Sequence, residues 1–202
     1  MTLFFEAEAR RSGYRLIAGL DEAGRGPLAG PVVAAAVVLP EGCRIRDLTD
    51  SKQLTPLKRE RLFKEIQEQA VCLAVGISDT GVIERINILE ATRRAMEKAV
   101  MALDPVPDYL LIDAIGIRSL IPQLGIVKGD LLSHSISAAS VIAKVTRDRI
   151  MEEYHEVYPV YNFRRHKGYG TPEHLMKIRT FGPSPIHRKT FRGVREYCTG
   201  LE

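Results

Sequence analysis

Four acidic residues lie at or just after the ends of short apolar runs, and this placement is the main chemical signal in the sequence. They are Asp21, Glu22, Asp113 and Asp130. Strand ends can converge on one edge of a sheet, where four carboxylates would repel one another and raise at least one pKa unless cations bind. Two divalent ions about 3.5–4 Å apart would use such a set, one to activate a water and one to stabilise the leaving oxygen of an in-line displacement. The pattern predicts metal-dependent phosphodiester chemistry.

A glycine-rich turn follows the first two acids. Gly24 and Gly26 flank Arg25 and would let main-chain amides approach a ligand closely. Beside carboxylates, such a turn fits a phosphate or a sugar as the ligand. Taken alone, the stretch equally fits a solvated strand end followed by an ordinary turn, so the rest of the chain decides between the two interpretations.

The sequence lacks the patterns of several other site classes. The five histidines form no HxxxH or HxH pair, and no G-x-S-x-G, Walker A or strand-linked G-x-G-x-x-G motif occurs. Three scattered cysteines favour neither a disulfide framework nor a structural zinc site. Asp148 lies between two arginines. We interpret it as part of a helix-surface or supporting ion pair, with a site role as the lesser alternative.

The net charge of +4 conceals a basic C-terminal segment. Residues 164–195 contain nine lysines and arginines and one acid, a net charge of +8, while the remainder carries −4. Aromatic residues interleave with these charges: Phe163, Tyr169, Phe181 and Phe191. This combination favours contact with a nucleic-acid backbone over a merely solvated tail. No apolar run is long enough to span a bilayer, and no signal peptide is evident, so we expect a cytoplasmic protein with no membrane partner.

Alternating strands and helices would position these residues. The apolar runs predict five strands: Leu16–Leu20, Val32–Leu39, Val71–Ile77, Tyr109–Ile112 and Leu124–Val127. The pairs Thr55-Pro56, Thr171-Pro172 and Ser184-Pro185 predict helix starts, and we expect further helices at 80–103 and 131–158. This order predicts an α/β fold in which helices flank a mixed sheet. We expect a catalytic core at 1–158 and a basic helical C-terminal extension at 159–202, together one structural domain.

Seven segments resemble the bacterial ribonuclease HII family, in order over nearly the whole chain: 19–31, 50–52, 111–113, 128–130, 138–148, 166–171 and 182–188. The first reads GLDEAGRGPLAGP and the last GPSPIHR. The resemblance implies a ribonuclease H-like fold with a mixed five-stranded sheet and cleavage of RNA within RNA–DNA hybrids. It also implies incision on the 5′ side of ribonucleotides embedded in duplex DNA, leaving a 3′-hydroxyl and a 5′-phosphate, with Mg²⁺ or Mn²⁺ as cofactor.

The resemblance further implies roles for individual residues. The catalytic and metal-binding carboxylates of the family match the four acids Asp21, Glu22, Asp113 and Asp130. Its loop that senses the ribose 2′-hydroxyl, the group that separates RNA from DNA, matches Gly24, Arg25 and Gly26. The tyrosine that stacks on the sugar at the RNA–DNA junction matches Tyr169. For phosphate contacts we predict Ser51, Lys52, Lys128, Arg188 and Lys189.

Several alternatives stay open at this point. Ribonuclease HIII usually carries an additional N-terminal substrate-binding domain, for which the 15 residues before Leu16 leave no room. Another two-metal nuclease on a similar fold would not need a 2′-hydroxyl sensor, and a non-catalytic hybrid-binding protein would not need all four acids. We expect a monomer that acts on RNA–DNA hybrids and on DNA containing ribonucleotides, and the sequence leaves a replication-clamp partner open.

Overall fold

A mixed five-stranded sheet forms the centre of the molecule. The computed structural model describes residues 2–198, without the side chain of Lys52. The strands are β1 (Ile17–Ala23), β2 (Val32–Val38), β3 (Cys72–Ser78), β4 (Tyr109–Asp113) and β5 (Gln123–Ile126), in the order β3-β2-β1-β4-β5. β1, β2 and β3 pair antiparallel, whereas β4 is parallel to both β1 and β5. The predicted five strands and mixed sheet are confirmed.

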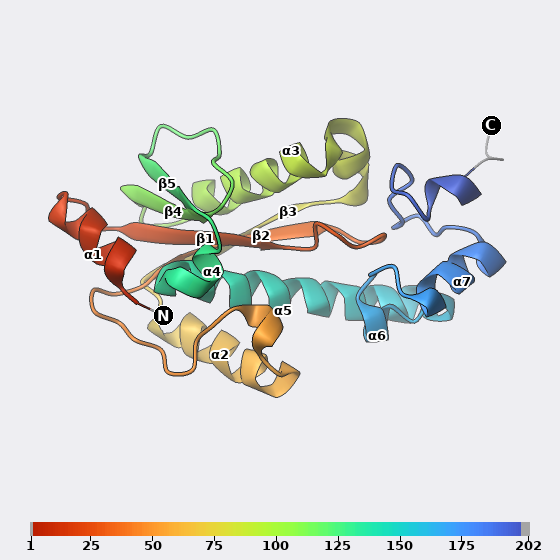
Figure 1. Cartoon of the computed structure of the whole chain (residues 1–202), viewed down its shortest axis with the longest axis horizontal. Helices are drawn as coiled ribbons and strands as arrows, with labels where there is room; N and C mark the ends of the chain where they lie inside the picture. Colours follow the sequence, from red (N-terminus) through yellow and green to blue (C-terminus); the bar gives the residue numbers. More distant parts are fainter. Residues whose placement is uncertain (1, 199–202) are drawn as a thin grey trace.

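Helices cover both faces of this sheet. They are α1 (Phe4–Arg11), α2 (Pro56–Gln69), α3 (Thr80–Met101), α4 (Gly129–Leu132), α5 (His134–Val157), α6 (Phe163–His166) and α7 (Pro172–Phe181). Figure 1 shows α3 on one side of the sheet and α5 with α2 on the other. None of the helices in residues 2–198 has the length and apolar character needed to cross a membrane.

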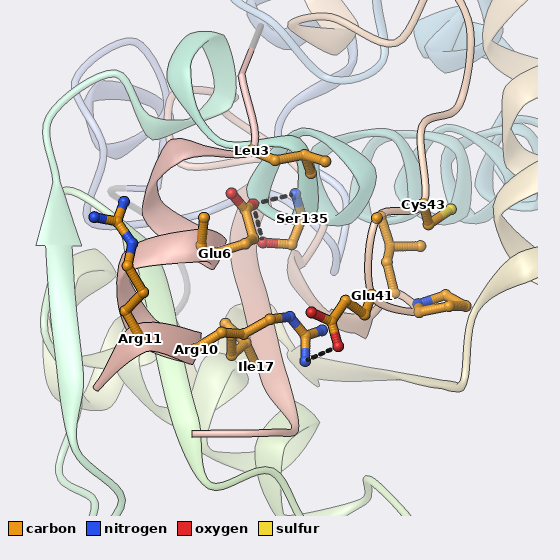
Figure 2. Close-up of a pocket in the computed structure, with 12 residues that line it drawn as sticks. Leu3, Glu6, Arg10, Arg11, Ile17, Glu41, Cys43 and Ser135 are labelled. Carbon is orange, nitrogen blue, oxygen red and sulfur yellow. Dashed lines mark hydrogen bonds and ion pairs between the residues drawn. The ribbon is translucent and has the colours of Figure 1, made fainter. Parts of the chain in front are cut away.

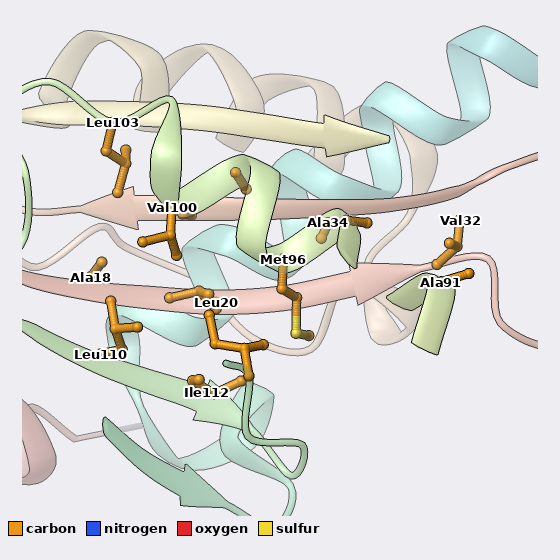
Figure 3. Packing of buried hydrophobic residues seen from close by; sticks show 14 of the residues in the cluster. Ala18, Leu20, Val32, Ala34, Ala91, Met96, Val100, Leu103, Leu110 and Ile112 are labelled. Carbon is orange, nitrogen blue, oxygen red and sulfur yellow. The ribbon is translucent and has the colours of Figure 1, made fainter. Parts of the chain in front are cut away.

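The two faces bury separate apolar clusters because strand side chains alternate between them. On the α3 face, Leu20 and Ile112 pack with Met96 and Val100 of the helix (Figure 3). On the other face, alanines and valines of β2 meet α2 and α5. A Cβ atom on Gly19 would lie 2.1 Å from the main-chain carbon of Ser135. The glycine therefore lets the first turn of α5 rest directly on β1, below the acids at the end of that strand.

The C-terminal extension packs on the far end of α5 and on the connection between β1 and β2 (Figure 1). Leu28 N donates to Gly168 O at 2.8 Å, and Arg188 N donates to Leu28 O at 2.8 Å. An isolated bridge joins Ala29 to His187. Residues 199–202 of the expected extension lie outside the described range.

Three expectations about the elements need correction. β1 continues to Ala23, so Asp21 and Glu22 belong to the strand instead of following it. The long helix predicted at 131–158 is broken at Ser133, whose side chain caps the first turn of α5 by accepting from Ile136 N. No helix begins at Ser184-Pro185, because the backbone there pairs with residues 28–30.

Candidate active site

The parallel pairing of β1 with β4 brings Asp21 and Asp113 together. Leu20 lies opposite Ile112 in the register, so Asp21 and Asp113 occupy the next position along the two strands. Side chains at equivalent positions of neighbouring strands point to the same face, which here is the face of α5. Glu22 points to the opposite face of β1. The strand ends thus converge as the sequence predicts.

Asp21 is the most deeply buried of the four acids, with 3% of its surface exposed. Burial raises its pKa well above the ordinary value, and the negative charges of Glu22 and Asp113 raise it further. Two hydrogen bonds act in the other direction. One comes from Ser140 of α5, and the other from Glu22 N, which donates to Asp21 Oδ1 at 2.7 Å. Ser140 and Glu22 N thus hold the Asp21 carboxylate in place, while burial and the neighbouring negative charges disfavour its ionised form.

Asp113 and Asp130 are linked through the turn that begins α4. Gly129 N donates to Asp113 Oδ1 at 2.7 Å. Asp130 follows directly in the first turn of α4 and is 7% exposed. Lys128, immediately before this turn, has a left-handed backbone (φ 57°) and an exposed side chain. The turn therefore places Asp130 next to the residue that fixes Asp113.

The donor chemistry of these four residues fits a hard divalent cation. Carboxylate oxygens are the ligands that Mg²⁺ and Mn²⁺ prefer, and a cation would relieve the repulsion that raises the pKa of Asp21. Among residues 2–198, no three Asp, Glu, His or Cys side chains are arranged around one point as metal ligands would be. The four residues thus have the ligand atoms that a divalent cation prefers, but their side chains are not gathered around a single point.

The glycine loop continues β1 beyond the acids. Arg25 is exposed, and its guanidinium lies 3.3 Å from Glu22 Oε1. Gly24 has φ +99°, and a Cβ atom on it would lie 2.1 Å from Arg147 Nε, so only glycine fits there. Gly26 is exposed, and a Cβ atom on it would meet only Tyr169 Cε1, at 3.8 Å. Tyr169, with 43% of its surface exposed, thus lies directly beside this loop.

Two buried arginines support the loop from behind. Arg188 donates from Nη1 to Arg25 O at 2.8 Å, from Nη2 to Gly24 O at 2.5 Å and from Nε to Gly30 O at 3.0 Å. Arg147 of α5 donates from Nε to Pro31 O at 3.0 Å and from Nη2 to Ala29 O at 3.1 Å. Burial lowers the pKa of Arg147 to about 10 and that of Arg188 to about 9. The main-chain conformation of the loop is therefore fixed by side chains.

The residues predicted to contact phosphate fall into different groups. Lys128 and Lys189 are exposed, so a phosphate contact by either stays a prediction, and the Lys52 side chain lies outside the described part of the structure. Arg188 needs correction, because it is fully buried and its guanidinium is occupied by carbonyls. Ser51 also needs correction, because it is 2% exposed and its Oγ lies 2.9 Å from Ser140 Oγ.

The structure adds supporting residues that the sequence did not single out. Ser140 of α5 hydrogen-bonds Asp21. Arg147 had no assigned role, although its spacing from Ala143 and Met151 places it on the buried side of α5. That spacing was the available signal. Asp148 forms the expected ion pair, 2.7 Å from Lys144 Nζ and 3.5 Å from Arg59 Nη1.

A cavity of about 500 Å³ lies near the opposite end of β1, beside Ile17 and away from the four acids. Figure 2 shows Glu6 in its wall, pointing toward Ser135. Glu6 Oε1 accepts from Ser135 N at 2.9 Å and from Ser133 Oγ at 2.7 Å. The Glu6 carboxylate connects α1 to the start of α5 and lies apart from the four acids of the candidate site.

The comparisons with known proteins agree with this geometry. The sequence model described as Ribonuclease HII matches residues 18–194. Ribonuclease HII of Geobacter sulfurreducens is 59% identical over 194 residues, which cover 96% of this chain and 89% of the relative. That of Geotalea uraniireducens is 58% identical over 201 residues, covering 99% and 93%.

Solved structures show the same fold. The ribonuclease H2 of Pyrococcus horikoshii OT3 superposes with a TM-score of 0.76 at 29% identity, covering 90% of this chain and 96% of that one. The crystal structure of Bst-RNase HIII in complex with Mn²⁺ has a TM-score of 0.69 at 20% identity, covering 94% and 71%, and shows the fold alone. The chain belongs to the ribonuclease HII family and is an endoribonuclease of RNA–DNA hybrids.

Proposed function

We propose that the enzyme also incises duplex DNA on the 5′ side of an embedded ribonucleotide and leaves a 3′-hydroxyl and a 5′-phosphate. The observation that carries this proposal is that β1 runs from the acids straight into the glycine loop, with Tyr169 beside that loop. The proposed catalytic acids Asp21 and Glu22 and the proposed sugar-binding loop at residues 24–26 thus lie on one strand and its direct continuation.

In this proposal the four carboxylates, Asp21, Glu22, Asp113 and Asp130, are the catalytic and metal-binding residues. Mg²⁺ or Mn²⁺, when bound, supplies activation of the attacking water and stabilisation of the leaving oxygen. The Mn²⁺ complex of Bst-RNase HIII, which shares the fold, supports this class of cofactor. Ser140 orients Asp21, and Gly129 N orients Asp113.

Recognition of the sugar falls to the loop and the tyrosine. The exposed main chain at Gly26 can be approached by a 2′-hydroxyl, since a Cβ atom there would meet only Tyr169. Gly24 is buried, and Arg147 and Arg188 fix the loop on that side, which holds Arg25 and Gly26 in position. The exposed Tyr169 ring offers a stacking surface for the sugar that follows the ribonucleotide. In this proposal the exposed side chains of Lys128 and Lys189 contact phosphates.

The test uses a labelled DNA duplex that contains one ribonucleotide, with an all-DNA duplex as the control. We expect incision 5′ to the ribonucleotide with Mg²⁺ or Mn²⁺, loss of incision in EDTA, and no cut in the control. Asp113→Asn should lower turnover by about 10³-fold or more while binding is retained. Unchanged turnover in that variant would overturn the assignment of the acids. Cleavage of a long hybrid without incision of the single-ribonucleotide duplex would overturn the proposed junction activity.

A further inference from the structure

Tyr169 lies between two glycines, and main-chain hydrogen bonds hold this stretch in part: Tyr169 N donates to His166 O at 2.9 Å, and Thr171 N donates to Tyr169 O at 2.8 Å. Gly168 precedes it, with φ +84°, and Gly170 follows it. Glycine on both sides gives the main chain many accessible conformations. The ring is 43% exposed, so its own packing restrains it only in part. A tyrosine that reads a sugar needs a fixed position, and that position must come from bonds to its main chain.

Two buried histidines supply such a bond. His174, in the first turn of α7, places Nδ1 2.9 Å from Tyr169 O, and its Nε2 lies 2.9 Å from Nε2 of His187. Both rings are 0% exposed. His187 Nδ1 accepts from Ser184 N at 2.9 Å. The chain of contacts runs from the C-terminal segment through both rings to the tyrosine.

The direction of each hydrogen bond follows from one fixed donor. The Ser184 main-chain N–H can only donate, so Nδ1 of His187 carries no proton and its Nε2 does. Nε2 of His187 then donates to Nε2 of His174, which leaves the proton of His174 on Nδ1, facing the Tyr169 carbonyl. His187 therefore selects the tautomer of His174 that can hold Tyr169.

The surroundings keep both rings neutral. Burial, together with the charges of neighbouring histidines, lowers the pKa of His174 to about 4 and that of His187 to about 3. His166 stacks on His174 with ring centroids 4.3 Å apart, and Phe163 meets the edge of His174 at 5.5 Å. A protonated pair would set two donors against each other across 2.9 Å, and this packing leaves no room for the rings to separate.

We propose that His187 and His174 act as positioning residues that fix the main chain of Tyr169, and with it the ring beside Gly26, for recognition of the RNA–DNA junction. This inference rests on the proposed role of Tyr169. It gives the histidine pair a function in selectivity, in addition to its part in packing the C-terminal extension.

The primary readout is the ratio of initial rates on a single-ribonucleotide duplex and on a uniform RNA–DNA hybrid. We expect both Tyr169→Ala and His174→Phe to lower this ratio by about 10- to 100-fold. His174→Asn keeps a donor at the Nδ1 position and should restore most of it. In the Tyr169→Ala background, His174→Phe should have no further effect, because residues acting through one another are not additive.

The matched control is His134, a buried histidine at the start of α5 whose Nε2 accepts from Ile45 N at 2.9 Å. His134→Phe should lower stability without changing the ratio. An unchanged ratio in Tyr169→Ala would overturn the proposed role of the tyrosine and this inference with it. A ratio that falls in Tyr169→Ala but not in His174→Phe, or effects that add fully, would overturn the inference alone.

A measurement on the unaltered protein covers the case in which His174→Phe does not fold. Nitrogen-15 NMR of the imidazole rings distinguishes the two neutral tautomers. We expect the proton of His174 on Nδ1 and that of His187 on Nε2 at neutral pH. The opposite tautomer at His174 would remove the bond to Tyr169 and overturn the inference.

Discussion

Asp21 is buried beside two other carboxylates, Glu22 and Asp113, which raise its pKa in addition to the effect of burial. Removing the charge of Asp21 removes both the cost of burying a charge and the repulsion from Glu22 and Asp113. We expect Asp21→Asn to raise the melting temperature of the metal-free protein by roughly 2–6 °C, from about 1–2 kcal/mol of relieved repulsion, and to abolish hybrid cleavage.

The control for this variant is Asp148→Asn. Asp148 is paired with Lys144 and Arg59, so loss of its charge should lower the melting temperature. Thermal unfolding in EDTA measures both variants. A lower melting temperature for Asp21→Asn than for the unaltered protein would show that the buried carboxylate is net stabilising and that the repulsion is overestimated.

The two glycines of the loop should respond differently to alanine. Gly24→Ala would place a Cβ atom 2.1 Å from Arg147 Nε at φ +99°, and we expect it to cost about 1–3 kcal/mol of stability. Gly26→Ala would meet only Tyr169 Cε1 at 3.8 Å, an ordinary contact. It should leave urea unfolding within about 0.5 kcal/mol and still weaken incision at a ribonucleotide. Equal incision by Gly26→Ala and the unaltered enzyme would remove the loop from sugar recognition.

Helix α5 and the C-terminal segment meet behind the glycine loop, and their arginines act by geometry as well as by charge. Arg188→Lys retains the charge but cannot reach three separate carbonyls. We expect it to lower the free energy of unfolding by about 2–3 kcal/mol, measured by urea denaturation. Lys189→Met, an exposed neighbour, should change stability by less than about 0.5 kcal/mol.

The same pair of variants separates the two roles considered for Arg188. A residue that contacts phosphate contributes about one unit to the slope of log affinity against log salt. We expect that slope, measured by hybrid binding to an Asp113→Asn background, to be unchanged by Arg188→Lys and reduced by Lys189→Met. A full loss of binding in Arg188→Lys with normal stability would return Arg188 to the phosphate contacts.

Local sequence signals located several elements to the residue. Thr55-Pro56 and Thr171-Pro172 begin α2 and α7 with a threonine cap and a proline in the first turn, as predicted. Ser184-Pro185 carries the same signal and forms no helix, because Ile186 and Arg188 pair their main chain with the loop between β1 and β2. A cap signal describes local preference, and here a long-range pairing prevailed over it.

Burial of polar residues was the part of the site that the sequence could not supply. Arginine and serine are mostly exposed in proteins, so Arg188 and Ser51 were expected to face a ligand. Whether such a residue is buried depends on carbonyls or hydroxyls that distant segments bring to it, such as Gly24 O for Arg188 and Ser140 for Ser51. Asp113 ends β4 as predicted, and Asp21 and Glu22 lie in the last three residues of β1, because a strand's direction and its apolar run are both local features.

The histidine pair links the stability of the whole molecule to pH. His174 and His187 have pKa values of about 4 and about 3 when folded, below the ordinary value of 6.5. The unfolded chain therefore binds more protons between about pH 4 and 6.5, and stability rises with pH across that window. We expect a loss of about 1.4 kcal/mol per pH unit for each histidine on the acid side.

Urea denaturation between pH 4.5 and 7.5 measures this slope. The raised pKa of Asp21 makes stability fall as pH rises, which opposes the effect of the histidines. A variant that removes only a histidine is therefore needed to isolate their contribution to the slope. His187→Asn keeps an acceptor for Ser184 N and does not titrate, and it should flatten the slope. An identical slope in the two proteins would place the acid sensitivity elsewhere, for example at His166.

The support of Gly24 and Arg25 by Arg188 has a consequence for the order in which a ribosome completes this enzyme. The four acids are all present once residue 130 has been made, whereas the side chain that holds the sugar-reading loop arrives 58 residues later. A chain that stops after α5, between residues 158 and 187, retains the four acids and the helix that packs on their sheet but lacks Arg188, which holds the glycine loop. Premature termination or C-terminal proteolysis in that interval would therefore reduce substrate selectivity before it removes the catalytic acids. Only the full-length chain couples the acids to a fixed sugar-binding loop.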